Sequence, residues 1–181
     1  MNLMPLDKFN LLKQRWDESA PHLDNPELFD QKIVPAMKLM NAVDGLTTIW
    51  SCQGHPEETG PKRNTSGFIM FAVRDVEALL VLQRFYANLS TLYHNQRNLV
   101  RLTMSERGDL TMPMDPGGER YWYPVWILNW GIYWLNTEKR YAQILEAATA
   151  AVEGRDVKCV ALTRTAPRPI REGEDHDSTS A

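Results

Sequence analysis

The chain has 181 residues, of which 43% are hydrophobic and 24% are charged, and this is enough apolar material for the core of one folded domain. Its net charge is −3, whereas proteins that bind nucleic acids usually carry a basic stripe, so the sequence has no strong nucleic-acid signature. No run approaches the roughly 18 consecutive apolar residues that cross a bilayer, so we expect no membrane segment.

The beginning of the chain predicts a cytoplasmic protein. Residues 1–7 lack a charged region followed by an apolar run, which is the pattern of a secretory signal. Only two cysteines are present, Cys52 and Cys159. Without an export signal, we expect both thiols to stay reduced in the cytoplasm.

The first part of the chain, residues 7–44, is predicted to be a helical segment. A short amphipathic helix is expected over residues 7–18. A second helix is expected to begin at Asn25, which suits the N-cap position. Pro35 predicts a kink in it, or a fresh helix start near Val34. The inward-facing residues of the two helices would be Phe9, Leu12 and Trp16, and then Phe29, Ile33, Met37 and Met40.

The rest of the chain alternates strand and helix patterns. Strands are expected over residues 46–52, 67–73, 99–105, 121–135 and 157–162, and helices over residues 75–94 and 137–152. A long loop over residues 106–119 is typical of a lid over a site. We therefore predict an α+β fold with a single domain over residues 1–164, in which helices pack on one face of a mixed or antiparallel sheet of about five strands. Residues 165–181 have almost nothing to bury and are predicted to be a disordered tail.

The segment with the most chemical potential is Ser51-Cys52-Gln53-Gly54-His55, where a predicted strand runs into a turn. Cys52 could be a nucleophile activated by His55, and we predict these two as catalytic residues. In a second interpretation, Ser51, Gln53 and Gly54 bind a ligand with backbone N–H groups and polar side chains. In a third, the thiol packs as a small hydrophobic group and the turn has no chemical role.

The spacing of Cys52 and His55 would also suit a metal ion. However, the neighbouring sequence offers no obvious further ligands, and Cys159, His94, Glu57 or Glu58 would have to converge from elsewhere. We therefore assign no metal site and no cofactor.

Four tryptophans recur at every fourth position in residues 121–135, namely Trp122, Trp126, Trp130 and Trp134. Such a set suits the stacking of bases, but large aromatic side chains more often pack in the core. We expect mainly core packing, with Trp126 lining a ligand pocket. Arg101, on the preceding strand, would meet an anionic ligand, and its alternative role is an ordinary solvated charge.

Two stretches resemble the wybutosine-synthesis methyltransferases, the third enzyme of that tRNA-modification pathway. They are Met37-Lys38-Leu39-Met40-Asn41 and Thr47-Thr48-Ile49-Trp50-Ser51-Cys52-Gln53-Gly54-His55. The family pattern has a serine where this chain has Trp50, and an arginine where it has His55. The resemblance implies a related α+β scaffold, a transferase activity and a ligand pocket beside Ser51, Cys52, Gly54 and His55.

These patterns favour a protein that binds a small molecule or a nucleotide at the 51–55 turn, and they leave open whether it is an enzyme. The alternative is a non-catalytic binding or inhibitor protein that acts through protein–protein contacts. The two functions predict different surfaces. A pocket holding Cys52, His55 and a third charged partner would favour ligand binding, whereas an exposed apolar patch without a pocket would favour the alternative.

Overall fold

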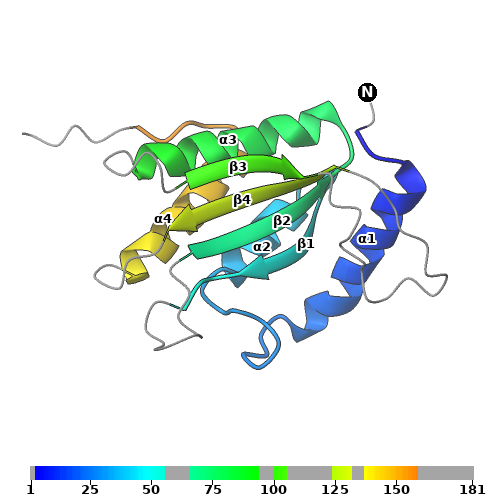
Figure 1. Cartoon of the computed structure of the whole chain (residues 1–181), viewed down its shortest axis with the longest axis horizontal. Coiled ribbons are helices and arrows are strands. Elements are labelled where there is room, and N and C mark those ends of the chain that lie inside the picture. Colours follow the sequence, from blue (N-terminus) through cyan, green and yellow to red (C-terminus); the bar gives the residue numbers. More distant parts are fainter. Residues whose placement is uncertain (1–2, 56–65, 94–99, 106–123, 132–136, 159–181) are drawn as a thin grey trace, which may run out of the picture.

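Figure 1 shows the protein as a computed structural model, in which residues 3–55, 66–93, 100–105, 124–131 and 137–158 are described. These residues form an α+β arrangement, as predicted. In chain order the elements are α1 (Leu6–Ser19), the short 3-10 helix η1 (Ala20–His22), α2 (Val34–Asn41), β1 (Leu46–Cys52), β2 (Ser66–Val73), α3 (Val76–Leu92), β3 (Val100–Ser105), β4 (Val125–Gly131) and α4 (Thr137–Val152).

The strands form one antiparallel sheet in the order β1-β2-β4-β3, so β1 and β3 are its outer strands. The described sheet has four strands, and the prediction of about five is wrong in this respect. Val157 and Lys158, the first residues of the expected fifth strand, belong to no strand. Instead, the N–H of Val157 donates to Oδ1 of the buried Asn88 on α3 at 3.0 Å, which fixes this part of the chain to a helix. Residues 159–162 lie outside the described residues.

Helices α2, α3 and α4 cover one face of the sheet, as predicted (Figure 1). Alternation along β2 points Ile69, Phe71 and Val73 toward these helices, and each is at most 1% exposed. Trp130 on β4 faces the same way and is 1% exposed, so the core role predicted for the tryptophans is confirmed for this one. Trp122 and Trp134 lie outside the described residues. This layer is the main core of the molecule.

Helix α1 is the exception to the prediction that the helices pack on one face. It lies beside the outer strand β1 (Figure 1). Its Trp16 joins the main core, whereas Phe9 and Leu12 pack with Met4 and Ala72 in a separate cluster. Ala72 follows Phe71 along β2 and therefore faces the other side of the sheet. Helix α1 thus covers the edge of the sheet at β1.

The helix start predicted at Asn25 is wrong, and the alternative of a fresh start near Val34 is confirmed. Helix α2 begins only at Val34, with Pro35 in the first turn, where its missing N–H removes no helical hydrogen bond. Asn25 does accept a hydrogen bond from the N–H of Glu27 at 2.9 Å, but this bond closes a turn and not a helix. The connection before α2 is therefore irregular, and it carries Asp30 to the end of β1.

Candidate functional site

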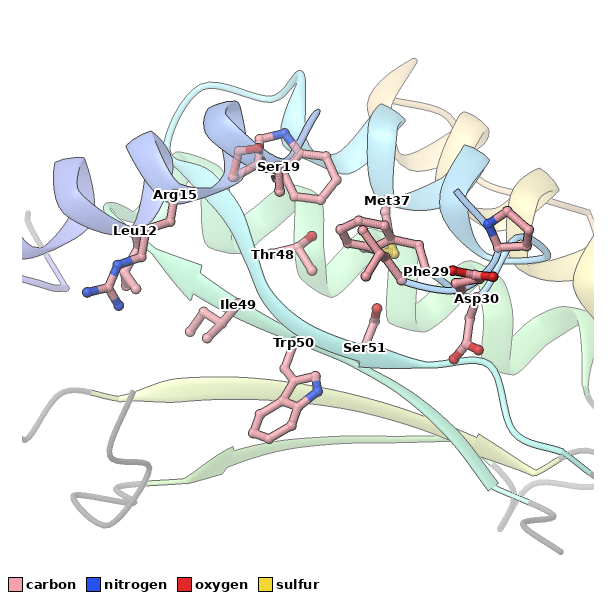
Figure 2. Close-up of a pocket in the computed structure, with 14 residues that line it drawn as sticks. Leu12, Arg15, Ser19, Phe29, Asp30, Met37, Thr48, Ile49, Trp50 and Ser51 are labelled. Carbon is pink, nitrogen blue, oxygen red and sulfur yellow. Dashed lines mark hydrogen bonds between the residues drawn. The ribbon is translucent and has the colours of Figure 1, made fainter. Parts of the chain in front are cut away.

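The outer strand β1 is irregular at its centre. Its pairing with β2 shifts between Thr48 and Trp50, so Ile49 is an extra residue that has no partner in the register. Figure 2 shows the result: Thr48 and Ser51 point to the side of β1 where Met37 lies, while Trp50 projects to the other side. The bulge thus places Thr48 and Ser51 on one side of the outer strand and Trp50 on the other.

A buried asparagine attaches α2 to β1. The Nδ2 group of Asn41 donates to the carbonyl oxygen of Met37 at 2.8 Å and to Oγ1 of Thr48 at 2.6 Å. Its Oδ1 accepts from the backbone N–H of Thr48 at 2.8 Å and from the hydroxyl of Thr47 at 3.2 Å. Asn41 is 5% exposed, so these bonds satisfy polar groups that water does not reach, and they fix the start of β1.

Two glycines shape the turn that follows β1. Gly54 has a φ of 86°, a backbone conformation that residues with a Cβ atom rarely adopt. Gly67 lies opposite on β2, where a Cβ atom would overlap the indole of Trp130 and come within 2.6 Å of the carbonyl oxygen of Gln53. The hydroxyl of Tyr141 on α4 donates to the carbonyl oxygens of Gln53 and Gly54, each at 3.4 Å. The turn is therefore held between the sheet and α4.

Asp30, Cys52 and His55 meet at this turn. One ligand atom of each, a carboxylate oxygen, the thiol sulfur and a ring nitrogen, lies within 4.8 Å of the other two. The Nε2 atom of His55 is 3.6 Å from Oδ1 of Asp30, and the side chains of these two residues are 31% and 25% exposed. Cys52 is half-buried. We call these three residues the Asp30 cluster. Chemically, a thiol, an imidazole and a carboxylate so close together can serve as nucleophile, base and orienting group, or as the ligands of a metal ion.

Backbone groups hold the Asp30 cluster in place. Oδ2 of Asp30 accepts from the N–H of Gln53 at 2.8 Å, and the sulfur of Cys52 accepts from the N–H of Gly54 at 3.4 Å. The side-chain oxygen of Gln53 accepts from the N–H of Lys32 at 3.1 Å. The connection before α2 and the turn after β1 are thus linked in both directions, and the cluster lies at their junction.

A cavity of about 430 Å³ lies between α1 and β1 and reaches Asp30, whereas Cys52 and His55 are not among the residues that line it. Figure 2 shows its lining, in which Asp30 and Ser51 stand at one end and Leu12 and Arg15 at the other. Its volume is within the range of small-molecule sites, about 300–1,000 Å³. Its apolar wall consists of Leu12, Trp16, Pro26, Leu28, Phe29, Met37, Ile49 and Trp50, and the polar side chains are those of Arg15, Ser19, Glu27, Asp30, Thr48 and Ser51.

The structure brings some of the predicted site residues together and leaves others apart. Ser51 lines the cavity, and Gln53 and Gly54 contact the Asp30 cluster through their backbone N–H groups. Arg101 lies on β3, at the opposite edge of the sheet, where it pairs with Asn129. Trp126 lies on β4, is half-buried and packs against the main core. Neither residue lines the cavity, and their ligand-binding roles stay predictions.

Asp30 is the member of the site that the sequence did not reveal. No spacing links it to Cys52, and it was expected within a helix that in fact begins at Val34. The lid predicted over residues 106–119 lies outside the described residues, as do His94, Glu57, Glu58 and Cys159.

Comparison with protein-family models, with curated proteins and with solved structures gives no match for this chain. The resemblance to the wybutosine-synthesis methyltransferases therefore stays a prediction. Among the helices in the described ranges, none combines the length and apolar character needed to cross a membrane.

Proposed function

We propose that the protein binds a small organic ligand in the cavity between α1 and β1, and that the Asp30 cluster acts on this ligand. The observation that carries the proposal is the position of Asp30, which lines the cavity and also lies within 4.8 Å of the reactive atoms of Cys52 and His55. A bound molecule would therefore contact the cavity wall and Asp30, and would lie next to Cys52 and His55 without needing to touch them. A pocket, a thiol–imidazole pair and a third charged group are the three features expected of such a site.

The lining favours a ligand that combines a flat ring with N–H donors, as a nucleobase does. Trp16 and Phe29 are aromatic members of the lining that a ring could pack against, and Met37 is a polarisable neighbour. Next to Phe29, the carboxylate of Asp30 and the hydroxyl of Ser51 can accept hydrogen bonds from amino groups. A nucleotide or a similar small molecule is thus the class that we propose.

The alternative, a protein that acts through protein–protein contacts, has weaker support. Leu28 and Trp50 are 63% and 58% exposed and border the cavity. The other large exposed apolar side chains are spread over α1, α3, α4 and β3. Scattered exposed apolar residues are normal on a soluble domain and indicate no interface by themselves.

The proposal is tested by filling the cavity. Ser51→Leu adds a larger side chain at the cavity wall, and Ser105→Leu makes the same change at a half-buried serine of the other outer strand. Native mass spectrometry of the freshly purified protein, followed by thermal unfolding with a panel of nucleosides and nucleotides, identifies a ligand. A ligand at 100 times its Kd should raise Tm by about 5–10 °C.

We expect Ser51→Leu to abolish this rise and Ser105→Leu to keep it. If both variants respond like the original chain, the ligand binds elsewhere and the proposal is wrong. Action on the ligand is tested with Cys52→Ala and His55→Ala, since full turnover in both folded variants would exclude a chemical role for the Asp30 cluster.

A further inference from the structure

We propose that Asp30, Cys52 and His55 bind one zinc ion. The inference deepens the proposed function, because it gives the Asp30 cluster a cofactor, and it rests on that function only for what the ion does to a ligand. The binding of zinc itself stands on the geometry of three side chains. The spacing of Cys52 and His55 suits a metal ion, but the sequence led us to assign no metal site, because the third group comes from the irregular connection before α2.

Asp30 and His55 are separated as an ion pair is, and this separation also suits two ligands that share an ion. The 3.6 Å between Nε2 of His55 and Oδ1 of Asp30 is too long for a hydrogen bond. Two ligands at the usual zinc distances of about 2.1 Å, arranged tetrahedrally, lie about 3.4 Å apart. The third ligand atom, the sulfur of Cys52, lies within 4.8 Å of both. An ion would bind all three after side-chain movements that bring the sulfur well within about 4.4 Å of the nitrogen, the sum of the usual zinc–sulfur and zinc–nitrogen distances.

The types of ligand select the ion. A thiolate is a soft ligand, an imidazole is intermediate and a carboxylate is hard, and zinc accepts all three in proteins. Magnesium and calcium prefer oxygen ligands only, so the sulfur of Cys52 argues against them. Copper also binds thiolate and imidazole, and the experiment below therefore includes it.

The surroundings provide the outer contacts that metal ligands need. The N–H of Gln53 donates to the Asp30 oxygen that does not face His55, so it orients the carboxylate. The N–H of Gly54 donates to the sulfur of Cys52 and orients the thiol. Both donors belong to the turn that Tyr141 holds from α4. The backbone thus orients two of the three ligands, Asp30 and Cys52, before an ion arrives.

Three protein ligands leave a coordination position for water or for a substrate atom, which is the pattern of catalytic and not of structural zinc sites. Since Asp30 also lines the cavity, a molecule bound there would lie next to this position. The cavity would then provide selectivity, and the ion would polarise a group of the ligand or a bound water.

The test titrates the full-length, chelator-treated protein with Zn²⁺, Co²⁺ and Cu²⁺ by calorimetry and measures bound metal by elemental analysis. We expect one zinc ion per chain. With Co²⁺ we expect the near-ultraviolet charge-transfer band that marks a thiolate ligand. Absence of zinc binding, or tight binding of copper without tight binding of zinc, would overturn the proposal.

Variants assign the ligands. Asp30→Asn, Cys52→Ala and His55→Ala should each weaken zinc binding by at least about 100-fold, the upper end of the effect of outer-shell changes. The matched controls Asp24→Asn, His22→Ala and Cys159→Ser should bind zinc as the original chain does, and Asp24 and His22 are exposed. If a control variant loses zinc binding while the matching cluster variant keeps it, the site lies elsewhere and the inference is wrong.

The two proposals fail in different ways. Ser51→Leu should lose the organic ligand and keep zinc, because Ser51 is not among the ligand residues. If zinc binds to the cluster while no organic ligand affects the protein, the proposed function fails alone. If a ligand binds in the cavity and zinc does not bind, this inference fails alone. If a cluster variant does not fold, the titration of the original chain still decides whether zinc binds.

Discussion

Asp30 has two oxygen atoms with different partners, and this division is the basis of the site. One oxygen accepts the N–H of Gln53 at 2.8 Å, while the other faces His55 at 3.6 Å. The backbone contact fixes the carboxylate, so the second oxygen is presented to the thiol and the imidazole at a constant position. The side chain of Asp30 thus joins the segment before α2 to the end of β1, together with the hydrogen bond from the N–H of Lys32 to Gln53.

The reactivity of Cys52 reports directly on this arrangement. In a chain carrying Cys159→Ser, alkylation by iodoacetamide measures Cys52 alone, and the half-buried thiol should react when a chelator is present. Zinc should lower the labelling in proportion to the fraction of protein that is bound, because a coordinated sulfur is not available for attack. Mass spectrometry quantifies the label. The protection should disappear with Asp30→Asn, and equal labelling with and without zinc would contradict the metal site.

For individual residues, the sequence predicted only those contacts that arise between near neighbours along the chain. Cys52, Gly54 and His55 lie within four positions, so their proximity was visible in the sequence. Asp30 was not, because its contact depends on where α2 begins and on the irregular path before it. Arg101 and Trp126 were chosen for their residue type and their place in predicted strands, and the structure places them on β3 and β4, outside the cavity lining.

Among the elements, α3 shows how one capping residue links stability to pH. Burial opposes the ionisation of Asp75, but the N–H of Ala78 and the guanidinium of Arg74 donate to its carboxylate and outweigh burial, so its pKa is lowered. A carboxyl with a lower pKa in the folded state stabilises the fold above its unfolded pKa. This contribution is lost as the pH falls through the folded pKa.

Asp75→Ala should therefore lower the free energy of unfolding by about 1 kcal/mol at pH 7, the usual effect of losing an N-cap. The difference from the original chain should shrink as the pH falls below about 4, the unperturbed range of an aspartate. Urea unfolding at several pH values measures both effects. Asp24→Ala, at a side chain that is 88% exposed, is the control. A difference that does not change between pH 7 and pH 2.5 would show that the charge of Asp75 is irrelevant.

The junction of α2 and β1 depends on Asn41. Truncation by Asn41→Ala would leave the N–H of Thr48 without its acceptor in a buried environment. We expect a loss of about 1–3 kcal/mol in the free energy of unfolding, the cost of an unsatisfied buried polar group. Asn10→Ala, at an exposed position on α1, is the control. Equal stability of the two variants would mean that the network around Asn41 is not needed.

The elements themselves were largely predictable, and the exceptions have physical causes. Strand β1 has the expected bounds, because its β-branched run lies between a glycine and a turn. The helix expected from Asn25 fails because Pro35 suits a first turn and not a helix interior. The strand expected from Val157 does not begin there, because the N–H of Val157 donates to Asn88 and not to a neighbouring strand. A contact between residues 69 positions apart in the chain has no local signal in the sequence.

In the whole molecule, the candidate site lies at the edge where the sheet is least regular. Helix α1 closes the side of β1, the bulge at Ile49 redirects its side chains, and α4 supports the turn that follows through Tyr141. The cavity is therefore a consequence of how α1 meets an outer strand. Residues from α1, the connection, α2 and β1 all contribute to its lining.

This construction makes metal binding a property of the complete fold. Asp30 reaches Cys52 and His55 only when the connection before α2 is docked against the turn after β1, so an unfolded chain offers no preformed three-ligand set. Zinc at 100 times its Kd should therefore stabilise the folded protein by about 2.7 kcal/mol, less any weak binding to the unfolded thiols. For a chain of this size, that corresponds to a rise in Tm of about 5–10 °C.

Thermal unfolding of four proteins separates the possible causes of such a rise. The original chain and Ser51→Leu should both be stabilised by zinc, because filling the cavity leaves the three ligands in place. Asp30→Asn should unfold at the same temperature with and without zinc, whereas Asp24→Asn should respond like the original chain. A zinc-induced rise that persists in Asp30→Asn would contradict the proposed site. The ion would then stabilise the fold without the residue that joins the connection before α2 to the turn after β1.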